Sequence, residues 1–402
     1  MEGGKSGTFT LQFLPEVVDL KKEIKSIYYI RVFAMMMVVL VHVTAPYSHL
    51  FSPNTIQHMS YHFLNNIVRV EAGLFIMLVG IVFFYNYRNR EWTPKVLLDY
   101  FRKRVVYILI PYVVWCIIYE ADAIHYNHKV FDLAGIIDNI IDGGSKYQLH
   151  FISLVVQFYL IFPILMFIVQ KSAFLRKYLW LVGIVIEFVY YFANLKYQLI
   201  TGPFFMSTMA AFLLGAWIGL HYEELTAKVT KTKTAWLFLA FLSMAIPYVL
   251  IRYQNAFNTR VPIPEELYKL IGIGFLVVGG IFFFYLSERF VMSFAESTTL
   301  KIKNIAYYSF GFYLMHPYVI TQVNIYFPIK DGWYSWHFMI FFQYFLVAVI
   351  CYFVIWWFHR FIPFASFVFG KLPKDAPLFW QVKKPASADV YPVSSEGYRK
   401  ET

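Results

Sequence analysis

Long apolar stretches separated by short charged segments divide this sequence. A helix that spans a bilayer needs about 20 mainly apolar residues, and ten stretches approach or reach that length. They cover residues 28–45, 64–85, 104–120, 150–170, 178–194, 203–221, 235–251, 269–286, 305–325 and 337–358. Because 59% of the residues are hydrophobic and only 15% are charged, we predict an all-α polytopic membrane protein with about ten transmembrane helices.

Basic residues are unevenly divided between the two sides of these predicted spans. With the N-terminus inside, the inner segments carry 26 Lys and Arg residues and the outer segments carry 6. Inner loops of membrane proteins are enriched in Lys and Arg, so both termini are predicted to be cytoplasmic. The net charge of +11 then follows from topology and from anionic inner-leaflet lipid, and no nucleic-acid motif accompanies it.

Two ionisable residues, Arg31 and His42, interrupt the first apolar stretch. Eleven helical steps separate them by roughly 16 Å and by about 20° beyond three full turns, which places both on one helix face. Ionisable side chains at membrane depth cost roughly 3 kcal/mol or more and usually face a functional protein interior. The alternative is that Arg31 extends to the membrane interface and His42 only hydrogen-bonds to a neighbouring helix.

A further histidine, His316, lies in the ninth predicted span, within the stretch SFGFYLMHP. In a helix that runs outward, His316 is about eleven residues, or roughly 17 Å, above the cytoplasmic end. His42 is at roughly 21 Å by the same count, so the two histidines are predicted to share one level of the bundle. Pro317 lacks a backbone N–H, and membrane proteins tolerate the freed carbonyl where protein or a cavity covers it.

Two other segments have polar side chains that suit substrates. Arg102, Lys103 and Arg104 open the third span, where they suit phosphate or are ordinary inner-loop charge. The stretch YQLHFISLVVQFYLIFP, with His150 and Gln157, begins the fourth span. This polar, aromatic outer end suits a sugar, and an interfacial aromatic belt is the equally weighted alternative.

The remaining buried charges have structural explanations. Arg69 and Glu71 are expected to pair with each other or with a neighbouring helix, which would reduce the cost of burying them. Glu187 is expected to be a structural partner more than a catalytic acid, because a buried carboxyl needs a hydrogen bond. The spacing His125-x-x-His128 lacks a third ligand, so no metal site is predicted.

Together these motifs resemble the integral membrane acyltransferase 3 family, over residues 25–360. The chain is similar to the branch that contains the intercellular-adhesion polysaccharide modifiers of Gram-positive bacteria. With the side of the tails taken from the charge asymmetry, we predict a cytoplasmic tail at 1–27, an acyltransferase 3 transmembrane domain at 28–360 and a cytoplasmic tail at 361–402. Two departures concern donor contacts. Val79-Gly80 stands where the family often has Ser-Gly, and Tyr107 stands near the place of a further Arg.

The resemblance implies an enzyme of the bacterial plasma membrane that moves an acetyl or succinyl group from cytoplasmic acyl-CoA to a hydroxyl of an extracytoplasmic polysaccharide. A neutral imidazole at His42 could take the proton of that hydroxyl. Arg31 could hold the donor's phosphates or pantetheine arm, and His316 could orient His42 or the acceptor. The expected substrate-binding residues are Arg102, Lys103, Arg104, Tyr313, His150 and Gln157.

No bound cofactor is expected, since acyl-CoA is a substrate. The expected partners are acyl-CoA, the glycan, the lipid bilayer and machinery for glycan synthesis or export. Many members of the family carry an extracytoplasmic hydrolase-like domain; none is evident in this sequence, so the chain is expected to act alone or to pass its acyl group to another protein. The alternative functions are an exporter of polysaccharide or small solutes and a proton-coupled sensor. Residues 1–24 and 372–402 are expected to be disordered.

Overall fold

The apolar stretches fold into helices throughout the part of the chain that the structure describes. The computed structural model describes residues 23–126, 128–257, 263–328, 336–372 and 377–382. Its α-helices are α1 (Ser26–Thr44), α2 (Ile56–Ile67), α3 (Val70–Tyr87), α4 (Pro94–Arg104), α5 (Ile110–Tyr126), α6 (Leu133–Asp142), α7 (His150–Lys171), α8 (Ala173–Tyr197), α9 (Met209–Leu220), α10 (Tyr222–Ala227), α11 (Lys231–Phe257), α12 (Glu265–Ser293), α13 (Glu296–Tyr307), α14 (Ser309–Tyr326), α15 (Trp336–Phe361) and α16 (Ala365–Phe369). Short 3₁₀ turns lie at Pro46–His49, Phe205–Thr208 and Phe379–Gln381, and a π-helical turn lies at Val105–Leu109.

Eight helical segments among the described residues are long and apolar enough to cross a membrane. They are Ser26–Thr44, Ile56–Tyr87, Pro94–Tyr126, His150–Lys171, Ala173–Tyr197, Lys231–Phe257, Glu265–Ser293 and Trp336–Phe361. The all-α polytopic fold is therefore confirmed, while the number of crossings and the side on which the termini lie stay predictions. The sixth predicted span is the shorter apolar helix Phe205–Leu220. The ninth, 305–325, was wrong as one helix, because α13 ends at Tyr307 and α14 begins at Ser309.

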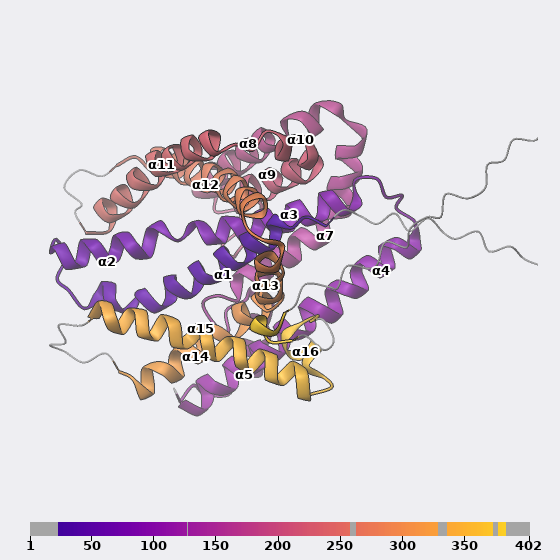
Figure 1. Cartoon of the computed structure of the whole chain (residues 1–402). Helices are drawn as coiled ribbons and strands as arrows, with labels where there is room; N and C mark the ends of the chain where they lie inside the picture. The colour runs from indigo at the N-terminus through magenta and orange to yellow at the C-terminus, as the bar shows by residue number, and fades with distance from the viewer. Residues whose placement is uncertain (1–22, 127, 258–262, 329–335, 373–376, 383–402) are drawn as a thin grey trace, which may run out of the picture.

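The helix α1 lies at the centre of the bundle. It packs against α2, α3, α12, α13, α14 and α15, and Figure 1 shows it between α3 and α12 on one side and α14 and α15 on the other. Buried residues occur all round it, from Tyr29 and Ile30 to Val41 and Val43, as expected for a helix enclosed by others. Its two ionisable residues, Arg31 and His42, are therefore surrounded by protein.

Glycines allow α3 and α9 to approach closely. A β-carbon at Gly80 would collide with the backbone carbonyl of Phe212, and one at Gly215 would collide with that of Met77. Small residues at helix interfaces let two backbones pack at short range. This contact fixes the position of α3. Arg69 directly precedes that helix, and Glu71 lies in its first turn.

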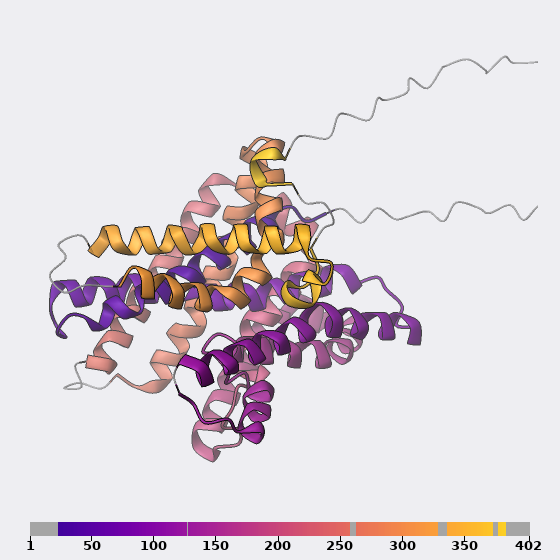
Figure 2. The same ribbon diagram turned by 90° about the horizontal axis from the view of Figure 1, so that it is seen from below.

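A long helix and a folded-back segment complete the bundle. The segment α4, the π-turn and α5 form one helix, Pro94–Tyr126, which Figure 2 shows in purple below the orange pair α14 and α15. Its α5 part packs against α14. Beyond α15, in the region predicted as a C-terminal tail, α16 packs into the body, and Trp115 Nε1 donates to the carbonyl of Val368 at 2.9 Å. Asn304 also donates to the carbonyl of Pro377 at 2.9 Å. The disorder predicted for the two tails falls mostly outside the described residues.

The glycine contact between α3 and α9 predicts a specific sensitivity to volume. Gly215→Ala should lower the melting temperature of the detergent-purified protein, because overpacking of this kind costs typically about 1–3 kcal/mol. Gly202→Ala is the matched control, since no heavy atom lies within 4 Å of a β-carbon placed there. Equal melting temperatures for both variants would contradict the close approach of the two backbones.

Candidate active site

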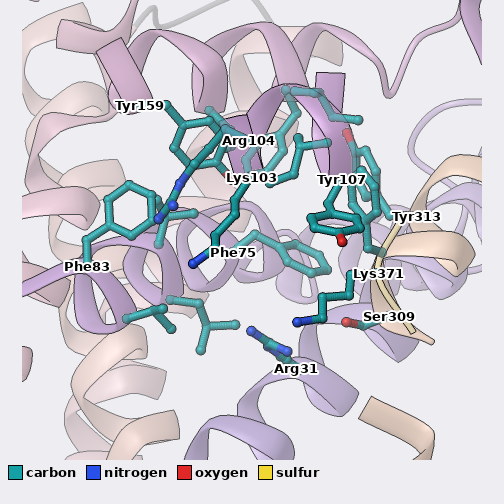
Figure 3. Close-up of a pocket in the computed structure, with 18 of the residues that line it drawn as sticks. Arg31, Phe75, Phe83, Lys103, Arg104, Tyr107, Tyr159, Ser309, Tyr313 and Lys371 are labelled. Carbon is teal, nitrogen blue, oxygen red and sulfur yellow. The ribbon is translucent and has the colours of Figure 1, made fainter. Parts of the chain in front are cut away.

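A cavity of about 370 Å³ lies beside the first turns of α1, at the end of that helix predicted to be cytoplasmic. We call it the inner cavity. Four cationic side chains line it, namely Arg31, Lys103, Arg104 and Lys371. Figure 3 shows Arg31 and Lys371 next to each other near Ser309, with Lys103 extending toward the same space. No carboxylate is among the described residues that line this cavity. The charge of the cavity therefore favours an anionic ligand, and both Arg and Lys bind phosphate well.

The cations come from three separate places in the chain. Arg31 projects from the second turn of α1, Lys103 and Arg104 end α4, and Lys371 follows α16. Arg104 is also held in place by its neighbour one turn earlier, since its Cζ lies 3.8 Å from the ring centroid of Tyr100 and its Nη1 donates to the Tyr100 carbonyl at 3.1 Å.

A second cavity, of about 160 Å³, lies beside the last turns of α1, and we call it the outer cavity. His42, Tyr147, Gln148 and His150 are among its lining residues, together with Glu71. Gln148 is 3% exposed, and neither its amide oxygen nor its amide nitrogen has a hydrogen-bond partner among the described residues. A buried polar group without a partner costs about 1–3 kcal/mol. The walls of this cavity thus offer buried donors and acceptors to a polar ligand.

The two predicted histidines meet at the edge of the outer cavity. The ring centroids of His42 and His316 lie 5.3 Å apart with an interplanar angle of 29°. The ring centroid of Tyr147 lies 4.4 Å from that of His42. His316 is fully buried, and its Nδ1 donates to the carbonyl of Phe312 at 2.9 Å. Nε2 of His316 has no partner among the described residues. In the neutral ring this leaves Nε2 as a free acceptor beside His42.

Three aromatic rings line both cavities and separate them. The ring of Phe75 lies 6.0 Å from Phe151 and 5.8 Å from Tyr313, and the last two rings lie 5.8 Å apart. These distances are in the range of favourable aromatic contacts. Tyr313 is fixed further because its hydroxyl donates to the carbonyl of Gln148. We call Phe75, Phe151 and Tyr313 the aromatic partition.

Most of the residues singled out in the sequence lie at these cavities. Arg31, Lys103 and Arg104 line the inner one, His42 and His150 the outer one, and Tyr313 both. Two of the predicted substrate-binding residues line neither cavity. Arg102 is exposed and is not among the lining residues of either cavity. Gln157 holds a loop instead, because its amide binds the backbone of Pro203 at 2.9 Å and of Phe205 at 3.0 Å.

Three other charged residues, Glu187, Arg69 and Glu71, were also singled out in the sequence. Glu187 accepts from Lys269 at 2.7 Å and from the backbone of Ala210 at 3.0 Å, which confirms its structural role. Arg69 and Glu71 attract each other electrostatically but form no salt bridge among the described residues, so the partner on a neighbouring helix is the alternative that the structure shows. The Arg69 guanidinium donates instead to the side chain of Asn65, which lies on α2.

The two histidines of the HxxH sequence, His125 and His128, do not lie on one helix. His125 is near the end of α5, whereas His128 lies beyond the last residue of that helix, Tyr126, and has a positive φ of 53°. Among the described residues no group of three His, Cys, Asp or Glu side chains could hold a metal ion.

Lys371 is a cation of the inner cavity that was not predicted from the sequence. It follows the short apolar segment of α16, and only the folding back of that segment brings it to Arg31. Its Nζ lies 5.8 Å from the ring centroid of Tyr107. Tyr107 belongs to the π-helical turn, and such turns occur frequently at functional sites.

The sequence of this chain matches the family model described as an acyltransferase domain, Acyl_transf_3, over residues 24–372. This chain belongs to the acyltransferase 3 family. Relatives of this acyltransferase 3 protein include the "probable poly-beta-1,6-N-acetyl-D-glucosamine export protein" of Staphylococcus aureus strains MSSA476 and MW2. Each is 25% identical over 299 residues, which is 69% of this chain and 79% of the relative. No solved structure matches the chain significantly.

Family membership and the apolar helices establish a multi-pass membrane protein of an acyltransferase family. The matched region runs past α16 and includes Lys371. Both departures from the family's usual pattern, Val79 and Tyr107, lie in the wall of the inner cavity.

Proposed function

We propose that this protein transfers an acetyl or succinyl group from cytoplasmic acyl-CoA to a hydroxyl of a cell-surface polysaccharide. One observation carries the proposal: a cationic cavity at Arg31 and a histidine cavity at His42 lie along the same helix and meet at the aromatic partition. Two reactants that approach from opposite sides of a membrane need such an arrangement. The polysaccharide in the name of the relatives makes a β-1,6-linked N-acetylglucosamine chain the first acceptor to test.

The inner cavity suits the donor. Coenzyme A carries its phosphates at one end and its thioester at the end of a long, narrow pantetheine arm. Arg31, Lys103 and Lys371 would hold phosphate groups, while Phe75 and Phe83 give the arm apolar walls. The thioester would then reach His42 when the side chains of Phe75 and Phe151 rotate, a change that needs no movement of the helices.

The outer cavity suits the transfer step. His42 would take the proton of the acceptor hydroxyl as its oxygen attacks the thioester carbonyl carbon. The bond from that carbon to sulfur then breaks, and the proton passes from the imidazolium to the departing thiolate, so that an ester and free coenzyme A are formed. His316 acts as a positioning residue, because its Nε2 can accept a hydrogen bond from His42 when positive charge develops there.

The name of the relatives supports a second candidate function, which is export of the polysaccharide. An exporter has to pass a glycan from one side of the bundle to the other, whereas it needs no binding site for coenzyme A. The two candidates therefore differ in one property: an exporter does not convert acyl-CoA.

The proposed donor site predicts a role for Lys371. Lys371→Ala should weaken binding of coenzyme A to the purified protein roughly tenfold or more, because hydrogen bonds to charged groups contribute about 1.5–3 kcal/mol. Isothermal titration calorimetry measures this affinity without any turnover. Lys301→Ala is the control, since Lys301 is an exposed lysine of α13. An unchanged affinity in Lys371→Ala would remove this residue from the donor site.

The proposed transfer step predicts a graded series of variants. His42→Ala should lower the transfer rate by about 10²-fold or more, the usual contribution of a general base. Arg31→Lys should also lose most activity, because an ammonium cannot reproduce the planar guanidinium fork. His316→Ala should be intermediate, since His316 positions the base without replacing it.

The assay uses purified protein in liposomes with labelled acetyl-CoA and an oligosaccharide acceptor. His125→Ala provides the control, because His125 is exposed on α5 away from both cavities. Equal transfer by wild type and His42→Ala would show that His42 is not the base. Absence of any acyl-CoA conversion by the wild type would favour the exporter.

A further inference from the structure

A third cavity, of about 390 Å³, lies beside the outer one. It is enclosed mainly by α8, α11 and α12, and its volume falls in the usual range of ligand pockets. Tyr191 near the end of α8, Arg252 near the end of α11 and Tyr268 near the start of α12 place it at the end of the bundle opposite α4. In Figure 1, α4 lies at the right and the ends of α11 and α12 that join lie at the left.

Stacked aromatic rings form one wall of this third cavity. The rings of Tyr248 and Tyr268 lie 5.5 Å apart and are inclined by 7°, and Phe275 continues the stack 4.8 Å from Tyr248. The guanidinium of Arg252 reaches the two tyrosine hydroxyls at 3.5 and 3.4 Å through Nη1. The guanidinium is thus held against the ring stack in the wall of the third cavity.

The charges around the cavity are only partly paired within the described residues. Glu187 and Lys269 satisfy each other at 2.7 Å. Glu71 is 8% exposed, and no described residue forms a hydrogen bond with its Oε2. Arg69 and Arg252 contact no carboxylate among the described residues. Burying charged groups without partners is costly, so this set of donors and acceptors is suited to a polar ligand that supplies the missing bonds.

We propose that this third cavity binds a sugar unit of the acceptor glycan, next to the unit whose hydroxyl reaches His42. The proposal rests on the proposed function. A pyranose ring has an apolar face that packs on aromatic side chains and hydroxyls that both donate and accept, which matches the ring stack, Arg252 and Glu71. Three residues, Arg69, Glu71 and Ala72, line both the third cavity and the outer one. A glycan bound across them would place successive sugars in the two cavities.

This arrangement makes acceptor length a determinant of affinity. A single sugar fills only one of the two cavities, whereas an oligosaccharide gains the contacts of both. The third cavity therefore selects polymer over monomer, and Arg252 is a specificity residue that lies away from the reacting atoms.

The test compares two acceptors with the purified protein: a pentamer of β-1,6-linked N-acetylglucosamine and N-acetylglucosamine itself. Arg252→Gln should raise the KM for the pentamer roughly tenfold or more, as expected for lost hydrogen bonds to a charged group, and should leave the KM for the monomer within about twofold. Tyr268→Ala should act in the same direction through the lost ring surface. Arg289→Gln on α12 is the matched control, since Arg289 lines none of these three cavities.

Direct binding of the pentamer without donor, measured by native mass spectrometry, separates this inference from the proposed function. Pentamer binding by the wild type that Arg252→Gln weakens supports the sugar site, even if no acyl group is transferred. Acyl transfer to the pentamer with the same KM in Arg252→Gln and wild type overturns the sugar site and leaves the transferase intact. Failure of the wild type to bind the pentamer also overturns it.

Discussion

The contact between the His42 and His316 rings is the interaction on which the rest of the structure depends. Two imidazoles can lie inside a helix bundle only if other helices cover them and if their polar atoms are accounted for. The Phe312 carbonyl binds one nitrogen of His316, and the helices around α1 exclude lipid from both rings.

In the proposed function, the aromatic partition would let one protein receive reactants from two sides without an open pore. Phe75, Phe151 and Tyr313 separate a cationic cavity from a cavity with buried amide and carboxyl groups. Each cavity alone is compatible with other functions, including transport. Their meeting point beside a histidine pair is what favours a transferase, because a transport path needs no base next to its narrowest point.

Helical periodicity was sufficient to predict part of this site. The eleven-residue spacing of Arg31 and His42 required only the geometry of one helix, and His316 followed from a count along another. Residues whose role depends on packing between distant segments were beyond such reasoning. Lys371 enters the inner cavity because α16 folds back. Arg102 and Gln157 had suitable chemistry, but the rotation of their helices directs them elsewhere.

The most direct test of the central claim uses sealed proteoliposomes with labelled acetyl-CoA outside and an N-acetylglucosamine oligosaccharide enclosed. Protein molecules whose cytoplasmic face is outward should transfer the label to the enclosed oligosaccharide, while both the coenzyme and the oligosaccharide stay on their own sides. This result would show that donor and acceptor meet within the membrane domain. Movement of unlabelled oligosaccharide across the membrane, with no ester formed, would contradict the account and identify an exporter.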